Sequence, residues 1–593
     1  MTGKPISRPA IILGVLAGAL TVCAIAVSCA LAAGTPLAIS PLTGTPDASP
    51  NTQISFLGVP ASDLSAIVVS ASRSGHHEGK LEPYASEPGA SFLPNRPFQP
   101  GERVTVTATV TAGSSKSTVG TTFTIADPYT LPREAASSKP PSSTASLQSF
   151  HSQRALHPPS VNILTNAADP ALGDIFISPD SGPGPNGAMI VEPSGQLVWF
   201  EPMAAGIDAM NLRVQQYYGK PVLTWWQGEV IEGHGQGEDV IDNTSYHRIG
   251  TVHAGNGLHA DLHEFQITPQ GTALLTAYEP VHYDLSPYGG SSDGLVDDCV
   301  AQEIDIKTGL VMFEWHALGH VSIADSYSRV PHIPADIFDF FHINSIQQQS
   351  DGDLLIGSRN TWAAYMISGQ SGGVLWRLGG KHSSFTLGPG VRFAWQHDPE
   401  IDSDGKLSVF DNEDTPPEGS ASRALRIELN FQAKTATLLG SLEHPGSPLL
   451  SPSQGNVQVL ENEDRLVGWG QAGYISEFSP SGQLTFDMQL PAPTNTYRAY
   501  RSPWSAQPGG TPALSASSSG STVTAYASWN GATNVASWRL LEGSSSKDLK
   551  PVKTFPRTGF ESELSAHTHG AYVAVQALAA SGEVLGTSPT SRT

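Results

Sequence analysis

Three stretches of the sequence share one pattern and decide the fold: LHEFQITPQGTALL (262–275), FHINSIQQQSDGDLL (341–355) and QHDPEIDSDGKLSVF (396–410). In each, a histidine precedes a short strand, and a turn glycine follows eight or ten residues after that histidine. The histidines are His263, His342 and His397. Repeated strand-turn-strand units predict a propeller, in which the first strand of each blade lines a central channel. Equivalent positions then face one centre, so we expect the three imidazoles to lie close together.

A hairpin repeat runs through the same part of the chain. Each copy has an apolar strand, a turn such as KTG or PSG, and a second strand that carries Leu or Val with Trp or Phe. Five copies are visible: GAMIVEPSGQLVWF (187–200), EIDIKTGLVMFEW (303–315), AAYMISGQSGGVLWRL (363–378), ALRIELNFQAKTATLL (424–439) and ISEFSPSGQLTFDM (475–488). We expect a sixth blade around PVLTWWQGEV (221–230), where the hairpin is degraded.

Composition places the protein in the all-β class and excludes one class of partner. The chain has 593 residues, too many for one core, with 59 Gly, 46 Pro and only 15% charged residues. This is typical of a turn-rich β protein. The formal net charge of −22 argues against a nucleic-acid partner, because binding phosphates requires clustered Lys and Arg.

The N-terminus predicts export. Lys4 and Arg8 precede an uncharged, mostly apolar stretch (11–33) that ends near small residues suited to cleavage. The stretch is also long enough to span a bilayer, so an uncleaved membrane anchor is the alternative to a cleaved signal peptide. Beyond it, Cys299 is the one cysteine of the sequence, which excludes an intramolecular disulfide in the exported part. We interpret Cys299 as a small buried residue rather than a reactive thiol.

The predicted organisation is an all-β chain with a six-bladed β-propeller between two β-sandwiches. Residues 1–35 are the signal peptide or anchor, and 36–127 alternate apolar and polar residues as an immunoglobulin-like sandwich does. A linker rich in Pro and Ser covers 128–160, and the propeller covers 161–505. Residues 506–593 resemble a fibronectin III-like sandwich.

An arginine joins the three histidines as a candidate site residue. Arg359 follows His342 by seventeen residues, and a hairpin of that length returns its guanidinium to the imidazole. Three imidazoles and one guanidinium make a cradle for a tetrahedral anion, because arginine offers a planar fork of donors. Three histidines can also hold zinc with an open position, but an arginine in the same cluster repels a cation. We therefore expect no metal and no cofactor.

Several motifs together resemble the bacterial and fungal arylsulfotransferase family over roughly residues 160–590. They are DLHEFQITPQGTALL, FHINS, SRNTW, WRLGGKHSSF, FAWQHDPE, FDNE with SRAL, and SWNGAT. The resemblance implies a six-bladed propeller that moves a sulfuryl group between phenols, without a nucleotide donor, through a transient sulfohistidine. It places the nucleophile at His397 and the other site residues at His263, His342 and Arg359.

The chemistry agrees with these roles. A sulfuryl group in transfer carries charge on three oxygens, so donors around those oxygens stabilise it, and a nucleophilic imidazole allows a ping-pong cycle. The chain has no P-loop for a nucleotide donor. The expected partners are a phenolic donor and a phenolic acceptor.

Further polar residues beside the histidines are candidates for supporting roles. We expect the carboxylates of Glu264 and Asp398 to fix the imidazole tautomers. Asn344, Asn456 and Gln396 are candidate substrate donors in the channel, although hydrogen bonding between blades explains them equally well.

Two other functions stay open, an exported binding or scaffold protein without turnover and an aryl sulfate hydrolase, because fold alone never establishes activity. Neither the natural substrates nor the oligomeric state follows from the sequence.

Overall fold

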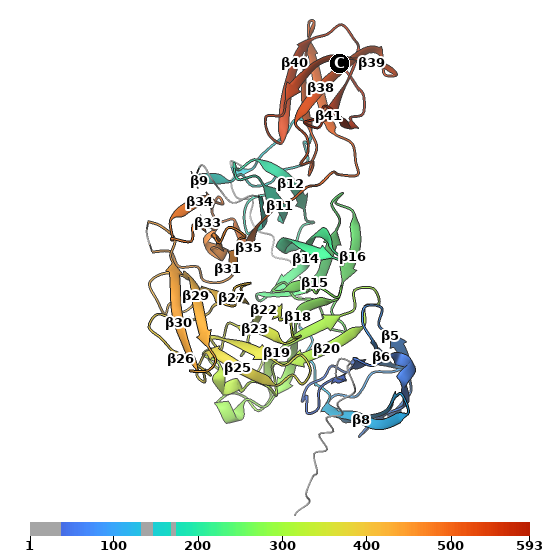
Figure 1. Ribbon diagram of the computed structural model, residues 1–593, viewed down its shortest axis with the longest axis vertical. Coiled ribbons are helices and arrows are strands. Elements are labelled where there is room, and N and C mark those ends of the chain that lie inside the picture. Colours follow the sequence, from blue (N-terminus) through green and yellow to red (C-terminus); the bar gives the residue numbers. More distant parts are fainter. Residues whose placement is uncertain (1–36, 132–145, 168–172, 447) are drawn as a thin grey trace, which may run out of the picture.

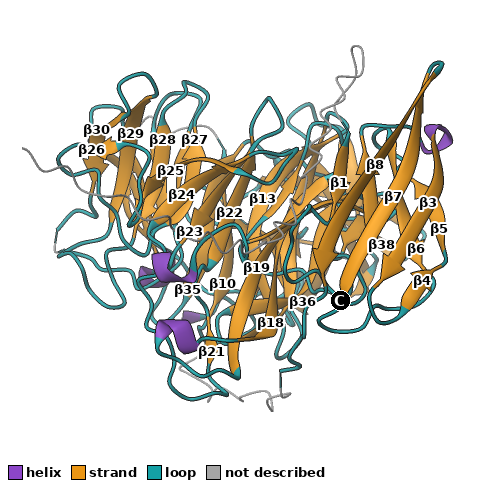
Figure 2. Cartoon of the chain, turned by 90° about the horizontal axis from the view of Figure 1, so that it is seen from below, coloured by secondary structure: helices purple, strands orange, loops and turns teal. Residues whose placement is uncertain are grey.

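The computed structural model describes residues 37–131, 146–167, 173–446 and 448–593. The predicted signal peptide or anchor (1–35) lies outside these residues, as does much of the predicted linker. Nearly all of the described regular structure is strand, with a few short 3-10 helices, which Figure 2 shows in orange and purple. The predicted all-β class is therefore confirmed. Among the described residues, no helix has the length and apolarity that crossing a membrane requires.

Six sheets follow one another along the central part of the chain, and most of their strand pairs are antiparallel. The first sheet contains β10 (Asp174–Asp180), β11 (Gly187–Val191), β12 (Leu197–Pro202) and β35 (Asn495–Ser502). The second contains β13 (Asp208–Tyr217), β14 (Lys220–Ile231), β15 (His234–Asp242) and β16 (Arg248–Val252). The third contains β17 (Phe265–Ile267), β18 (Ala273–Tyr283), β19 (Gly294–Ile304), β20 (Val311–His316) and β21 (Ile337–Phe338).

The other three sheets continue the series. The fourth contains β22 (Ile343–Gln348), β23 (Leu354–Ser358), β24 (Ala363–Ile367) and β25 (Val374–Gly379). The fifth contains β26 (Thr386–Leu387), β27 (His397–Ile401), β28 (Leu407–Asp411), β29 (Arg423–Asn430) and β30 (Thr435–Leu442). The sixth contains β31 (Asn456–Val459), β32 (Arg465–Gly468), β33 (Tyr474–Phe478), β34 (Leu484–Gln489) and β9 (Asn162–Asn166).

The six sheets form a closed ring, which Figure 1 shows face-on. One strand of each sheet contacts the corresponding strand of the next, in the order β13, β17, β22, β27, β31, β35 and back to β13. Two strand pairs join the beginning and end of this part of the chain, because β35 pairs with β10 and β9 pairs with β34. These inner strands bring sequence positions that lie far apart to one centre.

The five repeat copies are hairpins of the ring. They correspond to β11–β12, β19–β20, β24–β25, β29–β30 and β33–β34, each paired antiparallel. The region around 221–230 also lies in a sheet, where β14 pairs on both sides with β13 and β15. The turn glycines Gly271, Gly352 and Gly405 all have φ near +80°, a conformation that glycine adopts at little cost.

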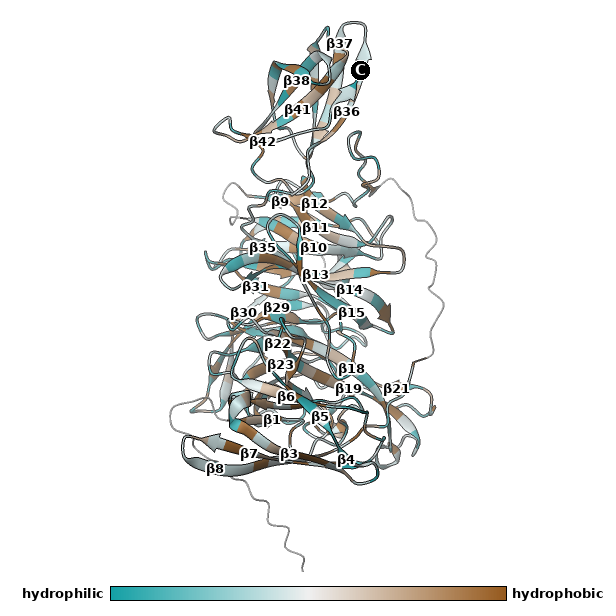
Figure 3. Ribbon diagram, turned by 90° about the vertical axis from the view of Figure 1, so that its right-hand side faces the viewer, coloured by the Kyte–Doolittle hydropathy of each residue, from teal (hydrophilic) through white to brown (hydrophobic). Residues whose placement is uncertain are grey.

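Two further pairs of sheets flank the ring at different places (Figures 1 and 3). The N-terminal pair has the strand orders β1-β2-β6-β5 and β4-β3-β7-β8. Its strands are β1 (Ala38–Ser40), β2 (Ile54–Leu57), β3 (Leu64–Ala71), β4 (Gly75–His77), β5 (Gly79–Pro83), β6 (Gly89–Pro94), β7 (Arg103–Ala112) and β8 (Ser115–Thr124). The residues between these two sheets form one apolar core.

The C-terminal pair has the orders β36-β37-β40 and β39-β38-β41-β42, with β43 (Ser591–Arg592) paired to β41. Its other strands are β36 (Ala513–Ser519), β37 (Thr522–Ser528), β38 (Ser537–Ser545), β39 (Asp548–Pro556), β40 (Glu561–His567), β41 (Tyr572–Leu578) and β42 (Val584–Thr587). These sheets also share an apolar core.

The N-terminal sheets dock on β20 of the third ring sheet. Strands β1, β2 and β6 all contact β20. The Ser55 hydroxyl donates to the carbonyl of Met312 at 2.5 Å, and the Tyr84 hydroxyl donates to the carbonyl of Val311 at 3.0 Å. This contact is therefore a hydrogen-bonded interface, and it shields one edge of the third ring sheet from solvent.

Candidate active site

The three predicted histidines occupy equivalent places in three successive sheets. His263 lies two residues before β17, His342 lies immediately before β22, and His397 is the first residue of β27. The ring centroids of His263 and His342 are 4.9 Å apart, and the Tyr497 ring lies 5.5 Å from His263 and 6.4 Å from His397. The structure therefore brings the three imidazoles into one cluster around Tyr497 of β35.

His397 has a fixed tautomer. Its Nδ1 faces the Asn412 Oδ1 at 2.8 Å, and the amide nitrogen of Asn412 donates to the carbonyls of Ser451 and Gln454. That orientation makes Oδ1 the only amide atom facing the ring, so Nδ1 carries the proton and Nε2 keeps its lone pair. The backbone N–H of Gln454 donates to Nε2 at 3.2 Å. Burial and the charge of Arg359 hold the pKa of His397 well below its usual value.

The other two histidines each face a carboxylate. His263 Nδ1 lies 2.6 Å from Asp261 Oδ2, and His342 Nδ1 forms a short hydrogen bond with Asp339 Oδ2. Burial outweighs the attraction to Asp339 and lowers the pKa of His342 to about 4. The pKa of Asp261 is lowered to about 2, against the effect of its burial, by the charge and hydrogen bond of His263. Sequence reasoning missed both carboxylates, although they lie two and three residues before their histidines.

Arg359 lies directly after β23, as the sequence predicts, and next to His342 in space. Its backbone N–H donates to the carbonyl of His342 at 3.0 Å. The guanidinium carbon lies 4.9 Å from the centroid of the Trp395 ring, and one Nη donates to Asn360 Oδ1 at 3.0 Å. Burial lowers the pKa of Arg359 from its usual value. The guanidinium therefore faces the same cluster as His397 and contributes positive charge there.

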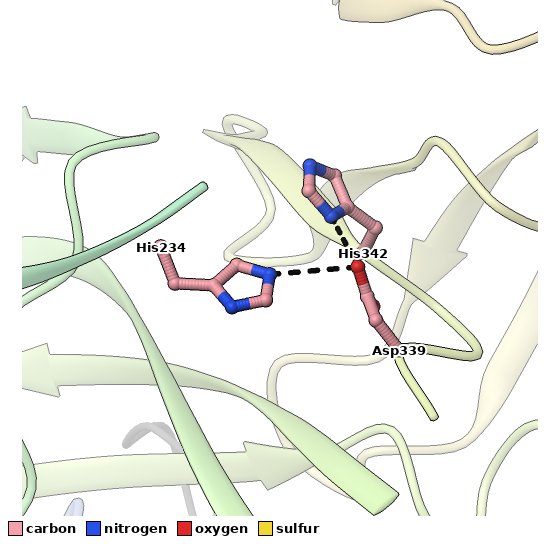
Figure 4. A group of neighbouring side chains, drawn as sticks. All are labelled: His234, Asp339 and His342. Atoms are coloured by element: carbon pink, nitrogen blue, oxygen red, sulfur yellow. Dashed lines mark hydrogen bonds and ion pairs between the residues drawn. The ribbon is translucent and has the colours of Figure 1, made fainter. Parts of the chain in front are cut away.

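A fourth histidine, His234, completes the cluster and was not predicted. It begins β15 and stacks on Tyr278, with ring centroids 4.0 Å apart, and its ring lies 5.4 Å from that of His342. His234 Nε2 lies 3.4 Å from Asp339 Oδ2. Figure 4 shows the rings of His234 and His342 both directed at this oxygen. Burial would lower the pKa of His234, but Asp339, Asp297 and Asp261 raise it to about 9.

One part of the cluster has ligand atoms suited to a metal ion. Nitrogen atoms of His234 and His342 and an oxygen of Asp339 lie within 4.8 Å of one another. Two imidazoles and a carboxylate are donors that zinc accepts. The same contacts are explained without a metal, because Asp339 forms a hydrogen bond with His342 and an ion pair with His234. Arg359 adds a positive charge near this group, because the charge of Asp339 raises the pKa of Arg359 against the effect of burial.

The expected tautomer-fixing roles of Glu264 and Asp398 are wrong. Glu264 forms ion pairs with Arg213 at 2.6 Å and Arg498 at 3.0 Å, and Asp398 forms one with Arg498 at 3.0 Å. Each acid follows its histidine directly in the chain, but its carboxylate is directed at Arg498 rather than at the ring. The two carboxylates therefore neutralise a buried arginine behind the histidines instead of contacting the rings.

The amide side chains Asn344, Gln396 and Asn456 bond to backbone groups of neighbouring strands. Asn344 donates to the carbonyl of Gln396 at 2.7 Å, and Gln396 donates to that of Ser358 at 2.8 Å. Asn456 donates to and accepts from Ala499, at 2.8 and 3.0 Å. These contacts link adjacent sheets of the ring, so the alternative of hydrogen bonding between sheets describes them better than a substrate-binding role.

Comparison with known proteins adds a family to this geometry. Residues 213–490 match the family model described as "Arylsulfotransferase (ASST)". No curated protein matches the chain. Similar solved structures include a protein of unknown function from Bacteroides caccae, 12% identical, which covers 56% of this chain and 100% of that chain with a TM-score of 0.35. Another is a protein from Lactobacillus plantarum, 11% identical, covering 66% of this chain and 97% of that chain with a TM-score of 0.31.

These structural likenesses are too distant to bear on fold or function, so the family match is the informative result. The matched segment contains all four predicted site residues, His263, His342, Arg359 and His397, together with His234. Residues 213–490 of this chain are thus similar to the arylsulfotransferase family.

Proposed function

We propose that the protein is a nucleotide-independent aryl sulfotransferase that works by a ping-pong mechanism through a sulfohistidine at His397. The observation that carries the proposal is the environment of His397. Asn412 holds the proton on Nδ1, so Nε2 is unprotonated and accepts a hydrogen bond from the Gln454 N–H, and a buried guanidinium lies close enough to lower the pKa of the ring. A neutral imidazole beside a positive charge is suited to attack an anionic sulfate ester.

In the first half-reaction, the Nε2 lone pair of His397 attacks sulfur and the bond between sulfur and the phenolic oxygen breaks. The departing phenolate accepts a proton. In the second half-reaction, an acceptor phenol gives its proton to the group that protonated the first phenolate, its oxygen attacks the same sulfur, and the N–S bond breaks to restore His397. Arg359 stabilises the charge on the sulfuryl oxygens, and the Gln454 N–H, which bonds to Nε2 in the free protein, becomes available to them.

His234 is the proposed acid for the departing phenolate. Its pKa of about 9 keeps it protonated at neutral pH, between the carboxylates of Asp297 and Asp339. Phenols have a pKa of about 10, so phenolate departure gains from a nearby proton donor. The neighbouring Tyr278 is buried, which raises its pKa well above its usual value and leaves its proton in place.

His342 and His263 have a different role in this mechanism. Because the pKa of His342 is about 4 and its Nδ1–H points to Asp339, its Nε2 is an acceptor in the free protein. It becomes a donor to sulfate oxygens only if it takes up a proton when the anion binds. A negative charge beside the ring favours this uptake. His263 has a comparable contact, with its Nδ1 facing Asp261.

We also propose the architecture and location that the sequence predicts. The six consecutive sheets support a six-bladed propeller over 161–505, with an immunoglobulin-like sandwich at 36–127 and a fibronectin III-like sandwich at 506–593. A signal peptide or membrane anchor at 1–35 would place the enzyme outside the cytoplasm, where nucleotide sulfate is not supplied. Its partners would then be a phenolic sulfate donor and a phenolic acceptor.

The direct test is transfer from p-nitrophenyl sulfate to phenol by the exported part, compared with His397→Ala. We expect p-nitrophenol release that depends on added phenol and disappears in the variant. His253→Ala is the matched control, because the His253 side chain is 65% exposed and remote from the cluster. Release without any acceptor would instead identify a hydrolase, and absence of release from every aryl sulfate tried would favour a binding protein.

The metal group of His234, Asp339 and His342 supports a second candidate, a metal-dependent aryl sulfate hydrolase. The two functions differ in their response to His397→Ala. A hydrolase that uses metal-bound water as nucleophile would keep turnover in that variant and lose it in His342→Ala. The sulfotransferase loses its covalent step in His397→Ala, whatever metal is supplied.

A further inference from the structure

A second histidine and carboxylate cluster lies away from the candidate active site, between the N-terminal sheets and the ring. Asp47 comes from the segment between β1 and β2, Asp298 from β19, and His316 is the last residue of β20. One side-chain nitrogen or oxygen from each lies within 4.8 Å of the others. Asp47, Asp298 and His316 are 5%, 0% and 1% exposed. The three groups are thus a closed, buried set of potential metal ligands.

Asp47 has no hydrogen-bond partner for either carboxylate oxygen, although both oxygens are buried. Its Oδ1 lies 3.6 Å from His316 Nδ1, beyond hydrogen-bond distance. Nearby Glu279 of β18 also has a buried oxygen without a hydrogen bond. Leaving buried carboxylate oxygens unpaired is costly, so this arrangement indicates that a positively charged group belongs between them.

The imidazole of His316 is held as metal-binding histidines are held. Its Nε2 lies 3.1 Å from Glu314 Oε1, while the other oxygen of Glu314 accepts from Asn256 at 2.8 Å and from Gln302 at 2.5 Å. A carboxylate on one ring nitrogen orients the other nitrogen toward a metal. That other nitrogen, Nδ1, faces Asp298 Oδ2 at 2.5 Å and then Asp47.

The charges around the cluster also favour a cation. Four carboxylates, those of Asp47, Asp298, Glu279 and Glu314, surround one imidazole. Glu279 and Glu314 are 9% and 1% exposed, so all four acidic side chains are buried together with the ring. A divalent ion would supply positive charge among them.

We propose that Asp47, Asp298 and His316 bind one divalent transition-metal ion of the zinc class, which fastens the N-terminal sheets to the third sheet of the ring. Glu279 of β18 lies opposite Asp298 in the neighbouring strand. An imidazole with carboxylates is a donor set that zinc accepts, whereas calcium and magnesium prefer oxygen alone. Because Asp47 belongs to the N-terminal unit and the other ligands to β19 and β20, the ion ties together segments far apart in the chain.

The proposal does not depend on sulfuryl transfer, and zinc itself is the probe. The full exported chain is loaded with Zn²⁺, dialysed against metal-free buffer and analysed for zinc per chain. We expect one tightly held ion in the wild type and its loss in Asp47→Asn, which keeps the size of the side chain but removes the charge. Asp293→Asn is the matched control, since that acid is 84% exposed and lies on the turn before β19.

The group of His234, Asp339 and His342 is separated from this site by two further measurements. His342→Gln should keep the tightly held zinc, and X-ray absorption of the loaded wild type should show one imidazole in the first shell rather than two. Zinc should also raise the melting temperature of the wild type and leave that of Asp47→Asn unchanged. The proposal is overturned if the wild type holds no zinc after dialysis, if Asp47→Asn retains it, or if absorption shows two imidazoles. If Asp47→Asn does not fold, the X-ray absorption measurement on the wild type is the test of the proposal.

Discussion

The side chain that faces Nδ1 of each imidazole influences the tautomer and the protonation of that ring. His263 and His342 face carboxylates, whereas His397 faces the neutral amide of Asn412. A neutral partner fixes the tautomer of His397 without stabilising its charged form, and burial with the charge of Arg359 lowers the pKa of the ring, which suits the proposed nucleophile. The assignment of roles among the histidines rests on this difference.

Replacing Asn412 by aspartate tests that assignment. In Asn412→Asp a carboxylate faces Nδ1 and raises the pKa of His397. The acid limb of the pH profile of kcat/KM should move to higher pH, because a larger share of His397 is protonated and cannot attack. A profile that keeps the position of its acid limb would contradict the role of the amide.

Replacing His234 by glutamine tests the proposed acid. In His234→Gln, transfer from phenyl sulfate should slow by about 10²–10⁴-fold, the usual contribution of a general acid. Transfer from p-nitrophenyl sulfate should slow far less, because its phenolate departs without a proton. In the wild type, transfer from phenyl sulfate should fall as pH rises through about 9, where His234 loses its proton. Equal slowing with both esters would remove His234 from the proton transfer.

The repeat identified His263, His342 and His397 from the sequence because equivalent strand positions face one centre. His234 could not be found in this way, since it lies at the turn between β14 and β15, where no equivalence of register applies. Glu264 and Asp398 were assigned to the wrong partners because nearness along the chain does not mean contact between the side chains. The arginine that pairs with both acids, Arg498, belongs to β35, which lies about 100 residues or more after them in the sequence.

At the scale of elements, β35 closes the ring and supplies a buried positive charge, Arg498, next to the strands that carry the histidines. Arg498 is fully buried and pairs with Glu264, before β17, and with Asp398 of β27. It also donates to the carbonyl of Asn344 in β22 at 2.8 Å. One guanidinium thus holds the beginnings of three neighbouring strands, and the three histidines precede or begin the same strands.

Loss of Arg498 should therefore cost both stability and activity. Arg498→Met leaves the buried Asp398 without its partner and Glu264 with Arg213 alone, and breaking such buried pairs costs about 3–5 kcal/mol. Urea unfolding measures this change in the free energy of unfolding. Arg426→Met is the control, since its partner Asp404 is 49% exposed and the pair is worth about 1 kcal/mol or less. Similar costs for both variants would contradict the role of Arg498.

The hairpins could be predicted from sequence because strand, turn glycine and strand lie within about fifteen residues. The pairs that close the ring, β10 with β35 and β9 with β34, carry no local signal, since their partners come from opposite ends of this part of the chain. Long-range pairing depends on the packing of the whole ring, which periodicity along the chain does not report.

At the scale of the whole molecule, the flanking sheets contact the ring away from the histidines. The Asn530 side chain accepts from the N–H of Phe200 in β12 and donates to its carbonyl, both at 3.0 Å. Gly531 adds a bond from its N–H to the carbonyl of Val198 at 2.8 Å. The C-terminal sheets are thus tied to an outer strand of the first ring sheet, as Figure 1 shows.

This separation predicts that docking and chemistry can be changed independently. Asn530→Ala removes both bonds to Phe200, and the loss should destabilise docking by about 1–3 kcal/mol. Limited proteolysis between 505 and 512 should become faster, while the rate of sulfuryl transfer stays unchanged. A fall in transfer rate with unchanged proteolysis would show that Asn530 acts on the site instead.

The central claim is that His397 carries the sulfuryl group between donor and acceptor. The most direct measurement is mass spectrometry of peptides from the enzyme quenched at alkaline pH after reaction with p-nitrophenyl sulfate in the absence of acceptor. We predict the added mass of one SO₃ group on the peptide with His397, removed when phenol is supplied before the quench. The account is contradicted if the group is found on another residue, or if transfer to phenol proceeds at full rate in His397→Ala.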